Sequence, residues 1–240
     1  MGHWLERSEL MFGKAGLARL AASRVAVFGV GGVGGAVVEA LARSGIGSLD
    51  LIDSDRVSLS NLNRQLIALH STMGQKKISA AAARARDINP QIKIEIFDCF
   101  YLPETADQFD FTQYDYIVDA IDTVAGKTEL AVRAARACVP ILSSMGFANK
   151  ADPTRIQVCD IYKTKVCPLA KAMRSNLRRA GIEHLKVVFS DEEPHKQAGP
   201  GRDEQGAKII GSNAFVPPVA GFVLAGEVIK DLIGYRNGCE

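Results

Sequence analysis

Short apolar runs alternate with longer amphipathic stretches along the first part of the chain. Residues 24–29 form a short apolar run, which is typical of a strand buried on both faces of a parallel sheet, residues 48–53 read as the next strand, and residues 114–122 read as an apolar strand that ends in two acids. Residues 33–45 and 76–88 have the spacing of helices. This alternation predicts an α/β fold: a doubly wound, Rossmann-like, mostly parallel sheet with helices on both faces.

The remaining pattern extends the sheet and adds a C-terminal packing helix. We expect further strands at 92–97, 140–144 and 155–161, and a short leading helix at 13–21. Residues 215–233 have an apolar helical pattern that prolines and charges interrupt, and a bilayer span needs ~20 residues. We therefore expect no transmembrane segment, and a helix that packs at the sheet or at a dimer interface.

Residues 190–212 break the pattern, because Pro, Gly and charged residues dominate there. Such a composition excludes a packed core. The sequence therefore predicts a mobile loop over the functional site or beside it.

Composition sets limits on the class of protein. A chain of 240 residues with 47% apolar content can bury one large core, and a net charge of +2 gives no general attraction to polyanions. Five cysteines, an odd number at irregular spacing and with no signal peptide, indicate reduced thiols in the cytoplasm. The chain has no C-x-x-C pair, so a zinc clamp built from such pairs is excluded.

Gly29, Gly31 and Gly34 form a G-x-G-x-x-G loop between the first strand and the first helix. Such a loop lets the backbone approach a phosphate at a helix N-terminus, which carries about half a positive charge. Asp53 ends the next strand, where a carboxylate can accept both ribose hydroxyls. These features fit NAD, FAD and ATP equally well.

Three following residues favour a triphosphate: Asn61, Arg64 and Lys77. A dinucleotide has little need of an extra Arg and Lys, whereas a triphosphate with a leaving pyrophosphate does. Asp122 falls at the same edge of the sheet, as a hard oxygen ligand for Mg²⁺. Taken singly, Lys77 also fits a solvated helix face and Asp122 a helix N-cap, but together these residues predict a site for ATP and Mg²⁺.

Four motifs identify a family resemblance: GVGGVGG at 29–35, DSDRVSLSNLNRQ at 53–65, GQKK at 74–77 and DAID at 119–122. They resemble the ThiF, MoeB and HesA superfamily, relatives of ubiquitin-activating enzymes that adenylate a carboxylate with ATP. Asn63 and the stretches VDAIDTVAGK, 151–163 and 168–174 are most similar to the branch of the tRNA threonylcarbamoyladenosine dehydratases.

The resemblance implies an ATP-driven cyclisation, with loss of water, of threonylcarbamoyladenosine in tRNA. It implies that Gly31, Gly32 and Gly34 hold phosphates, Asp53 the ribose, Asn61, Arg64 and Lys77 the polyphosphate, and Asp122 the Mg²⁺. It also implies a homodimer in which Arg7 reaches across the interface. We therefore expect one adenylating domain over 1–240, with a nucleotide-binding core at 1–162, a basic segment and loop at 163–212, and a C-terminal helix at 213–240.

Two local features bear on the substrate. Residues 163–186 hold seven basic residues against one acid, and Lys171, Arg174 and Arg178 share one face of a predicted helix. This stripe fits either RNA phosphates or a solvated helix surface. Cys167 precedes that helix, where a thiol could become nucleophilic, but a cyclisation needs no thiol.

Other classes stay open at this point. A protein-activating enzyme would adenylate the C-terminus of a ubiquitin-like sulfur carrier, but the lack of C-x-x-C pairs and the basic stripe weigh against it. A nucleotide-binding module or NAD oxidoreductase leaves Arg64 and Lys77 without a purpose. We expect tRNA as the partner, not DNA, and a sulfur-transfer protein as a possible further partner.

Overall fold

The computed structural model describes residues 3–199, 201–202 and 209–235. Within them a seven-stranded sheet has the order β3-β2-β1-β4-β5-β7-β6, with all neighbours parallel except the antiparallel pair β6 and β7. The strands are β1 (Arg24–Phe28), β2 (Ser48–Ile52), β3 (Lys93–Phe97), β4 (Tyr116–Asp119), β5 (Ile141–Ser144), β6 (Ile156–Asp160) and β7 (Lys186–Ser190). Because β2 and β4 flank β1, the chain winds outwards in both directions from the middle of the sheet.

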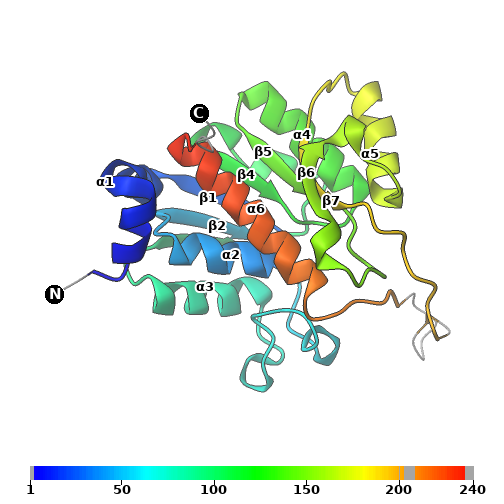
Figure 1. Ribbon diagram of the computed structural model, residues 1–240, viewed down its shortest axis with the longest axis horizontal. Coiled ribbons are helices and arrows are strands. Elements are labelled where there is room, and N and C mark those ends of the chain that lie inside the picture. The colour runs from blue at the N-terminus through cyan, green and yellow to red at the C-terminus, as the bar shows by residue number, and fades with distance from the viewer. Residues whose placement is uncertain (1–2, 200, 203–208, 236–240) are drawn as a thin grey trace.

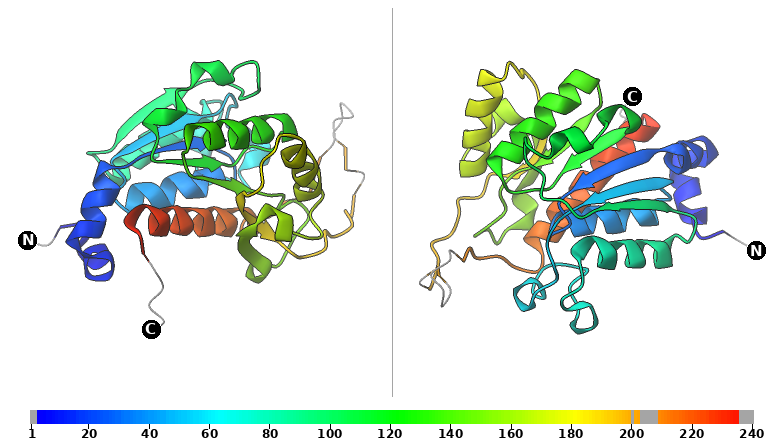
Figure 2. Two further views of the ribbon diagram at one scale, coloured as in Figure 1. Left: turned by 90° about the horizontal axis from the view of Figure 1, so that it is seen from above. Right: turned by 180° about the vertical axis from the view of Figure 1, so that it is seen from behind.

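Helices cover both faces of this sheet (Figures 1 and 2). They are α1 (Glu6–Ala22), α2 (Gly34–Arg43), α3 (Lys77–Ile88), α4 (Val124–Ala137), α5 (Pro168–Arg179) and α6 (Val216–Ile233). One face packs against α2, α3 and α6, with α1 lying against α6, while α4 covers the other face with α5 beside it. The expected α/β fold with helices on both faces is confirmed.

The alternation of β1 shows how one strand serves two cores. Val25 and Val27 point into the core shared with α2, α3 and α6. Ala26 and Phe28 point to the opposite side, where Phe28 meets an aromatic cluster beneath α4. A continuous apolar run is therefore what a strand at this position requires.

The C-terminal helix α6 packs directly on α2. A Cβ at Gly221 would lie 2.3 Å from the carbonyl oxygen of Val33, so a side chain there would force the helices apart. The pair places the start of α2, and with it the glycine loop, against the body of the domain. Among the described helices, none is both long and apolar enough to cross a bilayer.

Several elements differ from the sequence expectation. Helix α1 begins at Glu6, and Gly13 lies inside it at a kink with φ 70°, because glycine accepts a conformation that other residues avoid. Strand β4 ends at Asp119, so residues 120–123 form a turn. Strand β7 was not expected, since its short apolar run sits between a basic segment and a polar loop.

The described stretches between β7 and α6 contain no helix or strand, as expected for a loop. Residues 200 and 203–208 of that loop, and residues 236–240 of the expected C-terminal segment, lie outside the described residues. The mobility of the loop stays a prediction.

Candidate active site

A cleft of about 470 Å³ opens at the carboxyl ends of β1, β2 and β4. It lies where the strand order reverses, the usual ligand position in a doubly wound sheet. The residues lining it include most of the predicted site: Gly31, Gly32, Asp53, Asn61, Arg64, Lys77 and Asp122. Side chains far apart in the sequence are thus brought to one crevice.

The glycine loop turns tightly at one wall of the cleft. A Cβ at Gly34 would lie 1.8 Å from the carbonyl oxygen of Gly29, so only glycine fits where the loop enters α2. Asp53 fixes the loop from the neighbouring strand, since its Oδ2 accepts from the Val30 N–H at 2.7 Å and its Oδ1 from the Asp55 N–H at 2.8 Å. A carboxylate oxygen can accept a further donor, so Asp53 can brace the loop and still bind a ribose.

Two cations reach the cleft from the chain that follows β2: Arg64 lies between β2 and α3, and Lys77 is the first residue of α3. Nη1 of Arg64 donates to the carbonyl oxygen of Ser60 and to Oδ1 of Asn63, both at 2.9 Å, which orients the guanidinium. Lys77 is 6% exposed, and its Nζ lies 2.6 Å from Oδ2 of Asp55. Because the Asp55 side chain is largely exposed, a phosphate entering the cleft can compete with it for the Lys77 ammonium.

Of the two acids in the DAID motif, the structure leaves Asp122 available to a ligand. Asp119 is fully buried, with its Oδ2 2.9 Å from Nζ of Lys127 and 2.5 Å from Oγ of Ser143. Asp122 is exposed at the cleft and makes no hydrogen bond or ion pair within the described residues. One free carboxylate beside a phosphate site is a common protein contribution to a Mg²⁺ site.

Three buried polar atoms single out the same cleft. In the described part of the chain, the buried side-chain atoms without a hydrogen-bond partner are Oε1 of Gln65, the hydroxyl of Tyr101 and Oγ1 of Thr123. All three residues line the cleft. An unpaired buried polar group costs ~1–3 kcal/mol, so their gathering in one place indicates groups that a ligand satisfies. Sequence reasoning missed them, because burial is what sets them apart.

Asn61 is buried at the end of a 3₁₀ turn, Leu59–Asn61, in the wall of the cleft. Its Oδ1 accepts from the Ser58 N–H at 3.1 Å. The carboxamide oxygen therefore shapes the turn, and the amide nitrogen is the part that can serve a ligand.

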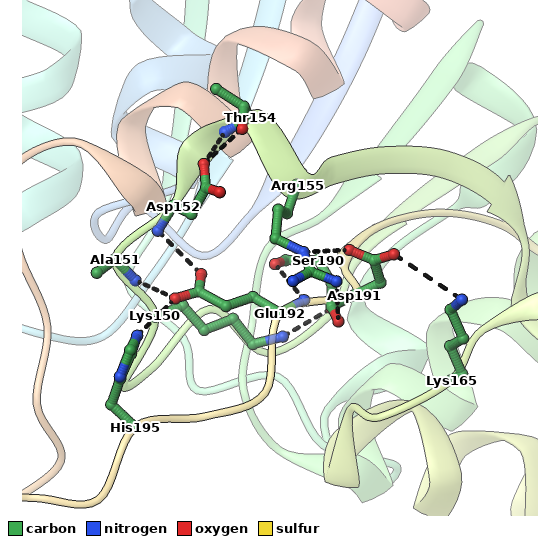
Figure 3. Close-up of polar contacts among 10 residues, drawn as sticks. All are labelled: Lys150, Ala151, Asp152, Thr154, Arg155, Lys165, Ser190, Asp191, Glu192 and His195. Carbon is green, nitrogen blue, oxygen red and sulfur yellow. Dashed lines mark hydrogen bonds and ion pairs between the residues drawn. The ribbon is translucent and has the colours of Figure 1, made fainter.

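The loop after β7 is fastened beside the cleft by a polar cluster that the sequence did not predict (Figure 3). Buried Glu192 accepts from the backbone N–H groups of Ala151 and Asp152, at 2.8 and 2.9 Å, and pairs with His195 at 2.8 Å. Burial alone would raise the pKa of Glu192, but these hydrogen bonds outweigh it and lower that pKa. Arg155 pairs with the preceding Asp191. We call residues 191–195 and 209–213 the strap.

The far end of the strap returns to the same turn. The Asn149 N–H donates to the carbonyl oxygen of Gly211 at 2.8 Å, and Nδ2 of Asn213 donates to that of Lys150 at 2.7 Å. Residues 210–212 line the cleft. The strap is therefore part of the wall, which agrees with the expectation of a loop over or beside the site.

The predicted basic stripe on α5 is only partly free. Lys171 and Arg178 are exposed, and Arg178 lies over the ring of Tyr162 at 5.1 Å. Arg174 is half-buried and donates to the side chain and to the carbonyl oxygen of Thr164. All three residues lie outside the cleft lining.

Two further candidates also lie outside the cleft lining. Arg7 is exposed near the start of α1, so any part in catalysis requires a second chain. Cys167 is 3% exposed and caps α5, with its sulfur accepting from the Ala170 N–H at 3.5 Å. A buried capping thiol favours a structural role.

Comparison with known proteins identifies the family of the chain. The model of the ThiF family matches residues 5–239. The tRNA threonylcarbamoyladenosine dehydratase of Bacillus subtilis is 47% identical over 243 residues, covering 97% of this chain and 96% of the relative. The Escherichia coli enzyme of the same name is 39% identical over 168 residues, 70% of this chain and 63% of the relative.

Solved structures extend the likeness to the fold. That E. coli dehydratase in complex with ATP superposes with a TM-score of 0.86 at 33% identity, covering 95% of this chain and 93% of the other. Its complex with AMP gives a TM-score of 0.87 at 32% identity with the same coverage. The chain therefore belongs to the ThiF family, in the branch of the tRNA threonylcarbamoyladenosine dehydratases.

Proposed function

We propose that this protein uses ATP to activate the carboxylate of a threonylcarbamoyl group on a tRNA adenosine, and then closes that group into a ring with loss of water. The observation that carries the proposal is the convergence of the glycine loop with Asp53, Arg64, Lys77 and Asp122 on one cleft. The name of the B. subtilis relative supplies the substrate class, and ATP and AMP in the E. coli structures fit an adenylation.

Different walls of the cleft bind different parts of the nucleotide. The backbone at Gly31 and Gly32 and the start of α2 at Gly34 take the phosphates, because they offer N–H groups and the positive end of a helix. Asp53 takes the ribose. The polyphosphate lies towards Asn61, Arg64 and Lys77.

The reaction needs two displacements. A carboxylate oxygen of the threonylcarbamoyl group attacks the α-phosphorus of ATP, the bond to the bridging oxygen breaks, and pyrophosphate leaves. The carbamoyl oxygen then attacks the activated carbonyl, AMP leaves with the former carboxylate oxygen, and the carbamoyl nitrogen loses a proton. Arg64 and Lys77 stabilise the charge that grows on the departing phosphates, an effect that pre-oriented cations supply well in a partly enclosed site.

The residues present fit a Mg²⁺ ion held jointly with the nucleotide. No group of three or more His, Cys, Asp or Glu side chains suited to a metal occurs among the described residues, whereas Asp122 offers one unpaired carboxylate. Mg²⁺ in nucleotide sites is held by one or two carboxylates and by phosphates. When bound, the ion would neutralise phosphate charge.

The proposal extends to the assembly. We treat residues 1–240 as one adenylating domain that works as a homodimer, with the exposed Arg7 reaching the partner's cleft. The exposed Lys171 and Arg178, together with Arg174, supply a basic face for the tRNA, and a tRNA substrate implies work in the cytoplasm. A sulfur-transfer protein stays a possible further partner.

Nucleoside mass spectrometry of tRNA tests the proposed function. Cells that lack the protein should accumulate open threonylcarbamoyladenosine in place of the cyclised form, and the wild-type chain should restore the ring where a Lys77→Ala chain does not. An unchanged ratio of open to cyclised nucleoside would contradict the proposal. Loss of a sulfur-containing cofactor in those cells would favour the protein-activating alternative.

The basic face has its own test. Replacing Lys171, Arg174 and Arg178 together with Glu should weaken tRNA binding and flatten its salt dependence, because each neutralised phosphate adds about 0.7 to 0.9 to the log-log slope. ATP affinity, measured in parallel, should stay at the wild-type value. Equal tRNA affinity and an unaltered slope would show that the stripe is a solvated surface.

A further inference from the structure

A buried ion pair lies directly behind the turn that carries Asp122. Asp119 ends β4 and Lys127 lies in the first turns of α4, and both are 0% exposed. Nζ of Lys127 lies 2.9 Å from Oδ2 and 3.0 Å from Oδ1 of Asp119. No other ion pair among the described residues has both side chains so fully enclosed.

Asp119 and Lys127 form hydrogen bonds with the peptide groups on both sides of Ile121. Oδ1 of Asp119 accepts from the Ile121 N–H at 3.3 Å, and Nζ of Lys127 donates to the Ile121 carbonyl oxygen at 3.1 Å. Ser143 on the neighbouring strand holds the second Asp119 oxygen at 2.5 Å. The residue that follows Ile121 is Asp122. The hydrogen bonds from Asp119 and Lys127 therefore fix the backbone that orients the Asp122 carboxylate.

The stability of the fold gives little reason for charges at this position. Burying an ion pair costs several kcal/mol per ion, and well-packed apolar residues of similar volume are often as stable or more so. The exposed Asp122 has no partner of its own within the described residues. Its direction therefore depends on the turn, and the turn depends on Asp119 and Lys127.

We propose that Asp119 and Lys127 are positioning residues, which hold the turn at 119–122 so that Asp122 presents its carboxylate to the metal ion of a bound nucleotide. This inference rests on the proposed role of Asp122 in the function above. Neither residue touches the substrate: Asp119 and Lys127 act through the backbone of Ile121.

The test replaces both charges at once, with Asp119→Leu and Lys127→Met in one chain. An apolar pair leaves no unpaired charge behind and should keep the protein folded, but with a lowered thermal midpoint, because the Ile121 N–H, the Ile121 carbonyl oxygen and the Ser143 hydroxyl lose their partners. Binding of a fluorescent ATP analogue is then titrated against Mg²⁺, and again with the metal removed by EDTA. We expect the Mg²⁺ requirement to rise by about 10- to 100-fold, as for other groups that orient metal ligands, with unchanged affinity for the metal-free nucleotide.

A second buried acid provides the matched control. Asp50 is 0% exposed and pairs with Arg24 at 2.8 Å, away from the cleft lining. The paired change Asp50→Leu and Arg24→Met removes an ion pair from the same sheet and should leave the Mg²⁺ requirement as it is. Ser143→Ala keeps both charges of the Asp119 pair and should raise the requirement by about threefold, through one lost hydrogen bond. Ser143→Ala replaces the Asp119 and Lys127 double variant as the test if that double variant fails to fold.

The outcomes separate this inference from the proposed function. If Asp122→Ala removes the Mg²⁺ dependence of nucleotide binding and the folded double variant does not move it, the positioning role is wrong and the metal site stands. If Asp122→Ala itself leaves the dependence intact, the metal assignment fails and the positioning role fails with it. A raised requirement in the double variant, with the control at the wild-type value, supports the inference.

Discussion

The substitution Glu192→Gln tests how the strap is held beside the cleft. The Glu192 side chain is 8% exposed, and each of its two oxygens accepts a backbone N–H from the turn after β5. His195, within the strap itself, also pairs with Glu192 (Figure 3). A glutamine keeps the shape and one acceptor oxygen. Its amide nitrogen, however, must face an N–H donor where the second carboxylate oxygen was.

The expected loss of stability in Glu192→Gln follows from these contacts. Hydrogen bonds to a charged group contribute ~1.5–3 kcal/mol each, and a buried donor left unpaired adds a similar cost. Glu192→Gln loses one such bond and weakens the other, so we expect the free energy of unfolding to fall by ~2–4 kcal/mol at neutral pH. For a chain of this length that is a fall of roughly 5–15 °C in thermal midpoint.

The loss of unfolding free energy caused by Glu192→Gln should shrink as the pH falls. Hydrogen bonding lowers the pKa of Glu192 below its ordinary 4.5, so the carboxylate stabilises the fold above that pH, and the contribution disappears as the pH falls through the lowered pKa. Glutamine does not titrate. The gap in unfolding free energy between wild type and variant should therefore be full at pH 7 and close in acid.

Urea unfolding at neutral and acid pH measures this gap, and the chain contains its own control. Glu193, the next residue, is exposed, so Glu193→Gln makes the same chemical change at a solvated position. Surface changes of this kind stay within about 0.5 kcal/mol. Equal losses in Glu192→Gln and Glu193→Gln, or a gap that does not change with pH, would show that the Glu192 carboxylate does not hold the strap.

Three further variants test the cleft itself. Lys77→Ala should lower kcat for AMP formation by about a hundredfold while the fold survives, and full turnover would remove Lys77 from the site. Gln65→Leu should raise the free energy of unfolding by ~1 kcal/mol, because it removes a buried oxygen without a partner. It should also reduce the increase in thermal midpoint that ATP produces. A destabilised variant with the full ATP-induced increase would show that Gln65 is structural. Cys167→Ser should retain AMP formation with modified tRNA, and a thioester trapped on Cys167 would point to a protein-activating enzyme instead.

The sequence predicts the fold, and the edge of the sheet at which the cleft opens, for a physical reason. The central strands of the parallel sheet are buried on both faces, so their apolar runs are visible in the sequence, as in β1 and β4. Parallel strands end at one edge, so Asp53 and Asp122 can be assigned to one crevice without knowing any distance. Arg64 and Lys77 carry the charge that favours a triphosphate over a dinucleotide as the ligand.

Features that depend on packing between distant segments do not appear in the sequence. Asp119 and Asp122 look alike in DAID, and only the buried position of Lys127 shows that the first is tied and the second is free. Glu192 stands in a polar stretch where burial was not expected. The stripe on α5 follows from helical spacing, but the bonds from Arg174 to Thr164 come from a separate loop.

In the proposed reaction, a carboxylate of the tRNA substrate attacks the α-phosphorus of ATP in this cleft. The most direct measurement uses purified protein, ATP, and tRNA whose threonylcarbamoyl carboxylate carries heavy oxygen, followed by mass spectrometry of the released nucleotide. We expect AMP with one heavy oxygen in each molecule, formed together with the cyclised nucleoside. Unlabelled AMP, or release of ADP, would contradict it.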